Sequence, residues 1–108
     1  MSLQPMPLPP TALEPSGIND IMVALERIEP GQLVVYHRGR LAVDRIDDER
    51  LEPEERGHRR EIALIATRAH EMATEDRPRI HLTQFRMDHG NFAYVATGAA
   101  GCDRRLYN

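Results

Sequence analysis

The chain has 108 residues, 41% of them hydrophobic, which is enough for one domain with a single core and too little for two. Its apolar runs of four or five residues are too short for a membrane helix of roughly 20 residues, and its start lacks the pattern of a secretory signal. One cysteine makes no disulfide framework, so we expect a cytoplasmic protein.

All 14 basic residues are arginine, and they stand against 17 acidic residues for a net charge of -3. Guanidinium groups bind carboxylates, phosphates and guanine edges in a bidentate way that lysine cannot. An arginine-only surface is therefore compatible with nucleic-acid binding, although the same usage is typical of a high-GC genome.

The first 15 residues contain five of the eight prolines, so they cannot hold a helix or join a central strand. We expect residues 1–15 to form a disordered proline-rich arm, or alternatively an arm that lies along a partner subunit. Residues 16–97 are expected to form the single domain, and residues 98–108 a flexible tail without periodicity.

A first helix is predicted over about 17–29, with Ser16 as its N-cap and Glu29-Pro30-Gly31 as its stop signal. The residues from Leu33 to Tyr36 are β-branched, aromatic or aliphatic and predict a strand. After this strand, Arg38-Gly39 is either the turn of a second hairpin or the entry into a short helix, and we favour the short helix.

The major helix is predicted from Pro53 to Glu75. Proline suits the first helical position, where its missing N–H costs nothing. One apolar helical stripe follows, formed by Ile62, Ile65, Ala66, Ala69, Met72 and Ala73.

A β-hairpin is predicted over Arg79 to Thr97. Side chains alternate on both sides of the turn Asp88-His89-Gly90-Asn91, which is the period-two pattern of half-buried strands. The turn residues tolerate the left-handed backbone that a tight reversal needs.

No pattern in the sequence indicates catalysis. The five histidines never reach a metal-ligand spacing, and Cys102 has no positioned base. Phosphate-loop, dinucleotide and nucleophile-elbow motifs are missing, so we expect no enzyme, no metal, no cofactor and no small-molecule substrate. A pocket that joined His37, His70 and a carboxylate would favour an enzyme instead.

The order helix, strand, helical segment, strand, turn, strand over residues 17–97 resembles the winged-helix variant of the helix-turn-helix. The resemblance implies an α+β fold in which two main helices pack on a small three-stranded antiparallel sheet that ends in a β-hairpin. The segments YHRGRLAVDR, HLTQFR and FAYVA are also similar to short bacterial and phage-type proteins.

By this resemblance the hairpin turn is the wing and the major helix is the recognition helix. The chain would then be a small regulatory protein, phage-related in origin, that binds double-stranded DNA, with contacts expected from Arg38, Arg40, Arg59, Arg60, Arg68, Arg86 and His89.

A second hypothesis stays open beside DNA binding. From Glu54 to Arg77 the chain has six acidic and five basic residues, whereas DNA-reading helices usually carry net positive charge. The alternative is a protein-interaction or assembly module of the same fold that binds no nucleic acid. Both hypotheses predict a homo-oligomer, since a small core with an unprotected strand edge gains from burial against a partner.

Overall fold

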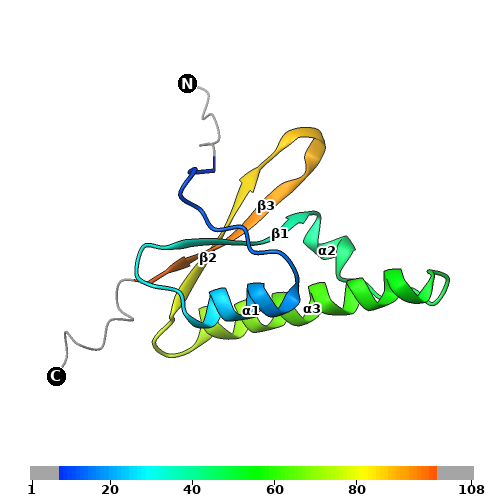
Figure 1. Cartoon of the computed structure of the whole chain (residues 1–108), viewed down its shortest axis with the longest axis horizontal. Coiled ribbons are helices and arrows are strands. Elements are labelled where there is room, and N and C mark those ends of the chain that lie inside the picture. The colour runs from blue at the N-terminus through cyan, green and yellow to red at the C-terminus, as the bar shows by residue number, and fades with distance from the viewer. Residues whose placement is uncertain (1–7, 100–108) are drawn as a thin grey trace.

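The computed structural model describes residues 8–99, which form an α+β arrangement of helices around one sheet (Figure 1). The predicted combination of two main helices with a three-stranded antiparallel sheet ending in a β-hairpin is confirmed. Within these residues, no helix combines the length and apolar character that a bilayer span requires. The elements are α1 (Ile18–Glu26), β1 (Leu33–Gly39), α2 (Leu41–Asp44), α3 (Pro53–Thr74), β2 (Ile80–Arg86), the 3-10 turn η1 (Asp88–Gly90) and β3 (Phe92–Gly98).

The strand order is β1-β3-β2, so the last strand of the chain lies between the other two. Thr97 on β3 pairs with Leu33 on one side and with His81 on the other. The prediction that the strand after the first helix joins the hairpin is therefore confirmed. The register of β1 shifts at Tyr36, the extra residue of a β-bulge.

One face of the sheet packs against α1 and α3, which lie side by side along it (Figure 1). Leu25 from α1, Met72 from α3 and Ile80 from β2 are fully buried in this core. The apolar stripe of α3 faces the sheet because its members recur every three or four residues. This burial is the main apolar contribution to the stability of the fold.

The opposite face of the sheet is covered by the proline-rich arm. Val35, Ala93 and Val95 are buried there, and Leu8 and Ala12 of the arm pack against them. The expected arm spans residues 1–15, of which 1–7 lie outside the described residues. Residues 8–15 lie against β1 of the same chain.

The arm also pairs with the outer edge of β1. Leu13 donates its backbone N–H to the carbonyl oxygen of Leu33 at 2.8 Å and accepts a hydrogen bond from the N–H of Val35, also at 2.8 Å. Proline cannot donate such bonds, but Leu13 follows the last proline of the Pro9-Pro10 pair by three residues. This edge of the sheet is therefore partly closed within the chain.

The first helix differs from its prediction at both ends. Its N-cap is Gly17, with a φ of 87°, rather than Ser16, and no side chain caps it. It ends at Glu26 rather than near Glu29 because the chain must turn into β1. Gln32 closes that turn by donating its N–H to the carbonyl oxygen of Glu29 and accepting the N–H of Glu29 on its side-chain oxygen.

The strand β3 also differs from the expected half-buried pattern. Residues 93–96 are all buried, because β3 is the central strand and both of its faces are covered. An alternating pattern in the sequence predicts a strand with one buried and one exposed face. It does not predict a central strand that is covered on both faces. The end of α3 at Thr74 lies within one residue of its prediction.

The favoured short helix after Gly39 is confirmed as α2, and hydrogen bonds attach it to the sheet. The N–H of Leu41 donates to the hydroxyl of Tyr94 at 3.0 Å. Asp44 lies 2.8 Å from His37 Nε2 and accepts the N–H of Arg40 at 2.9 Å. Burial raises the pKa of Asp44, but these hydrogen bonds outweigh it and leave this pKa below its usual value.

The end of β3 packs tightly against the turn that follows α1. A Cβ atom added to Gly98 would lie 1.9 Å from the carbonyl oxygen of Glu29, whereas one added to Gly57 on α3 would meet nothing within 4 Å. Gly98 lies at the start of the expected tail, of which residues 100–108 lie outside the described residues.

We expect Gly98→Ala to lower the free energy of unfolding by about 2 kcal/mol or more, because the backbone must shift to accept the methyl group. The matched variant Gly57→Ala should instead raise it by about 0.5–1 kcal/mol, since alanine favours the helix. Urea unfolding measures both changes. Equal effects of the two substitutions would contradict the close contact at Gly98.

Candidate functional site

The seven predicted DNA-contacting residues fall into three groups in the structure. Arg59, Arg60 and Arg68 lie on α3, Arg38 lies on β1 beside the arm, and three residues gather at the hairpin tip. The predicted contact residues are therefore spread over three parts of the structure. The tip residues are Arg40, Arg86 and His89.

On α3, Arg59 forms hydrogen bonds with the segment that precedes the helix. Its Nε donates to Glu55 at 3.1 Å, and its Nη1 donates to the carbonyl oxygens of Val43 and Ile46 at 3.0 and 3.1 Å. These backbone acceptors lie in and just after α2. Arg59 therefore fixes the α2–α3 connection and does not project as a reading residue would.

The other arginines of α3 pair with carboxylates from other parts of the chain. Arg68 donates to Glu26 of α1 at 2.6 Å, and Arg60 donates to Asp47 at 3.3 Å. Hydrogen bonding by Arg56 to the same aspartate lowers the pKa of Asp47 to about 2. All four arginines of α3 are thus matched by acidic side chains, which removes most of the positive potential that phosphate binding needs.

Arg38 is paired in the same way. It forms a bidentate hydrogen bond with Glu14, and its Nε lies 3.0 Å from the carboxylate. The pair lies at the surface, with both side chains nearly half exposed, so it stabilises the fold little. It attaches the arm to β1 and leaves Arg38 partly neutralised.

The hairpin tip keeps basic side chains that pair with no described carboxylate. Arg40 donates its Nε to the carbonyl oxygen of Gly90 at 3.3 Å, and Arg86 pairs with Phe92 in the β2–β3 ladder. His89 adopts a φ of 60° in the turn. Neither Arg86 nor His89 forms a hydrogen bond or ion pair with a described residue.

The outer edge of β2 is not paired with any strand of the described sheet. Two backbone hydrogen bonds at the ends of the β2–β3 ladder fix which residues are hydrogen-bonded pairs. Ala99 donates its N–H to the carbonyl oxygen of Arg79, and Met87 donates its N–H to that of Asn91, so the hydrogen-bonded pairs are the odd-numbered residues. The N–H and C=O groups of Leu82 and Gln84 therefore point away from β3. Residues 8–99 provide no strand to accept them.

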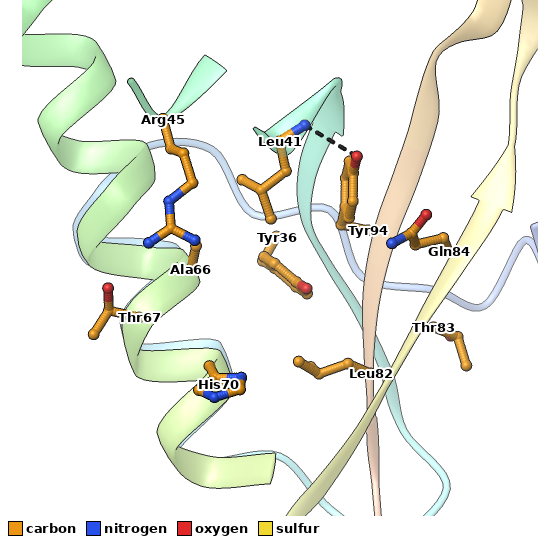
Figure 2. Close-up of a pocket in the computed structure, with 10 residues that line it drawn as sticks. All are labelled: Tyr36, Leu41, Arg45, Ala66, Thr67, His70, Leu82, Thr83, Gln84 and Tyr94. Atoms are coloured by element: carbon orange, nitrogen blue, oxygen red, sulfur yellow. Dashed lines mark hydrogen bonds between the residues drawn. The ribbon is translucent and has the colours of Figure 1, made fainter. Parts of the chain in front are cut away.

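A cleft of about 640 Å³ lies between α3 and the β2–β3 hairpin (Figure 2). Tyr36, Tyr94 and Leu41 lie at its centre, with the side chains of Arg45 and His70 on the α3 side and those of Leu82 and Gln84 on the hairpin side. The sequence contained one signal for it, the position of His70 one step beside the apolar stripe. No pattern in the sequence indicated that Tyr36 and Arg45 line one cleft.

The histidine constellation that would favour an enzyme does not assemble. His70 lines the cleft in Figure 2, whereas His37 lines a separate cavity of about 360 Å³ and bonds to Asp44. Among residues 8–99 no group of three histidine, cysteine or carboxylate side chains is arranged to hold a metal ion. Comparison of the chain with protein-family models, curated proteins and solved structures finds no match.

Burial, and to a lesser degree the neighbouring Tyr94, raises the pKa of Tyr36 to about 12. A tyrosine in an unfolded chain titrates near pH 10. The contribution of neutral Tyr36 to the free energy of unfolding is therefore fully present below about pH 10 and is lost as the pH rises towards 12. The loss should reach about 3 kcal/mol.

We expect urea unfolding of the wild type at rising pH to show this loss and Tyr36→Phe to remove most of it. The measurement is favourable because the chain has no lysine to titrate in the same range. An equal loss in the two proteins would contradict the assignment to Tyr36.

Proposed function

We propose that the chain is a non-enzymatic assembly module that binds a second copy of itself by strand addition at the outer edge of β2. The observation that carries the proposal is the row of outward N–H and C=O groups at Leu82 and Gln84. A flat unpaired edge is a template for another strand. β2 contains no proline and no acidic residue that would discourage such pairing.

The two edges of the sheet are treated differently by the chain. At β1 the arm pairs with Leu33 and Val35 and so shields that edge from other strands. At β2 most side chains of the strand are exposed, and Leu82 is 36% exposed. This asymmetry makes β2 the more open edge, and pairing through one edge favours a closed dimer over a continuous fibre.

The sequence of β2 suits antiparallel pairing with itself. With a two-fold axis at Thr83, Leu82 of one copy lies opposite Gln84 of the other, and both outward-facing residues meet outward-facing partners. Ile80 then lies opposite Arg86. The two copies of Arg86 are about 20 Å apart in this register, well beyond the screening length at physiological salt, so they do not repel.

The test is a proline at an outward-facing position. Gln84→Pro removes an N–H that β3 does not use, so the fold should survive while the edge can no longer pair. Gln84→Thr is the matched control, because it changes the same side chain and keeps the N–H. We expect light scattering to give a dimer for the wild type and the threonine variant and a monomer for the proline variant.

A wild-type protein that stays monomeric at millimolar concentration would contradict this function. So would a proline variant that remains folded and dimeric. Urea unfolding of each variant shows whether the fold is intact.

DNA binding is the second candidate, and the basic hairpin tip is the observation that favours it. The winged-helix assignment is part of this candidate and is supported by the central position of the last strand, although α2 has only four residues. Counted over the sequence, the tip carries two arginines and one aspartate, so its positive charge is small. The paired arginines of α3 weigh against a recognition helix.

If the tip contacts phosphates, the double variant Arg40→Gln with Arg86→Gln should weaken binding to duplex DNA and lower the slope of log affinity against log salt by about 2. Arg27→Gln is the control, since this exposed arginine of the α1 end has no partner among the described side chains. Fluorescence anisotropy with labelled duplex measures both. Unchanged binding in the double variant would exclude the tip.

A further inference from the structure

The cleft between α3 and the hairpin combines an apolar centre with a polar rim. The rings of Tyr36 and Tyr94 lie 6.3 Å apart between centroids, and Leu41, Ala66 and Leu82 add aliphatic surface. Its volume of about 640 Å³ lies within the range of small-molecule sites in proteins. The cleft is thus large enough for a molecule of one or two rings.

Two tyrosine hydroxyls are present in the cleft, and only one has a partner. Tyr94 accepts the N–H of Leu41 at 3.0 Å, as Figure 2 shows. Tyr36 is only 6% exposed, yet its hydroxyl forms no hydrogen bond with any residue of the described chain. In Figure 2 this hydroxyl points towards the hairpin, above the side chain of Leu82. Because Tyr36 lines the cleft and its hydroxyl has no partner in the described chain, this hydroxyl is available to a ligand.

Arg45 gives the cleft its charge. It follows α2 and lines the cleft, and within residues 8–99 it pairs with no carboxylate, unlike the four arginines of α3. His70 lies below it on the same side, in the view of Figure 2. No acidic residue lines the cleft. An unpaired guanidinium above an apolar floor is suited to a ligand carboxylate.

We propose that this cleft binds a small aromatic carboxylate. The carboxylate pairs with Arg45, and the ring occupies the apolar centre between the tyrosines and Leu82. The hydroxyl of Tyr36 donates a hydrogen bond to the ligand. The site is separate from the backbone groups used in strand addition and stands without the proposed assembly.

The probe is indole-3-acetate, with indole-3-acetamide as the neutral control of the same shape. The chain contains no tryptophan, so indole emission excited at wavelengths that tyrosine does not absorb comes from the probe alone. We expect saturable binding of indole-3-acetate in fluorescence anisotropy and binding of the amide that is at least roughly tenfold weaker, because a charged hydrogen-bonded pair is lost. Benzoate should compete with the probe.

Three variants test the residues. Arg45→Gln and Tyr36→Phe should each weaken binding of indole-3-acetate, the first by roughly tenfold. Thr67→Glu places a carboxylate on the exposed rim without disturbing the core and should weaken binding as well. Arg27→Gln removes an equal charge at a residue that does not line the cleft and should leave the affinity unchanged.

Urea unfolding and NMR spectra of the backbone amides establish that each variant is folded. Equal affinity for the acid and the amide, or wild-type affinity in folded Arg45→Gln, would overturn the assignment of the carboxylate to Arg45. No saturable binding of indole-3-acetate or benzoate to the wild type at millimolar concentration would overturn the site itself.

Discussion

The fold depends on the double pairing of β3. This strand is last in the chain, yet it hydrogen-bonds to β1 on one side and β2 on the other, and four successive residues in it are buried. The helices α1 and α3 cover one of its faces and the arm covers the other. Until β3 is in place, β1 has no partner in the sheet, so the chain must join residues about 60 positions apart before its core can close.

The charged residues of the surface serve mainly to connect elements. Glu26 of α1 accepts hydrogen bonds from Arg68 of α3 and from Arg79. Asp47 accepts a hydrogen bond from Arg56 of α3, and Glu14 of the arm accepts one from Arg38. Each exposed pair is worth little in stability, but together they neutralise most of the arginines that could have met phosphates. Among the arginines that stay without a described carboxylate, Arg40 and Arg86 lie together at the hairpin tip and Arg45 lines the cleft.

Local patterns predicted the elements whose causes are local. The apolar stripe and Pro53 indicated α3 almost to the residue, and the alternation with its turn indicated the hairpin. Burial on both faces of β3 could not be predicted, because it depends on arm residues more than 80 positions away in the sequence. The N-cap at Gly17 was missed because Ser16 has the better intrinsic preference, and the chain path required a positive φ one residue later.

The site was harder to predict than the fold. Seven basic residues were predicted to contact DNA, but ion pairs that depend on tertiary structure neutralise four of them. The cleft brings together Tyr36 and Arg45 only because the bulge in β1 and the short helix α2 turn the chain between them. The bulge has no pattern of its own in a single sequence, and the short helix was favoured after Gly39 without any sign that it borders a cleft.

Amide hydrogen exchange along β2, measured residue by residue at low and high protein concentration, tests the open edge most directly. The account predicts that the amides of Thr83 and Phe85 are protected at both concentrations, because they bond to β3. The amides of Leu82 and Gln84 should exchange rapidly in dilute solution and become protected as the concentration rises. The reverse alternation, or outward amides that exchange rapidly at every concentration, would contradict it.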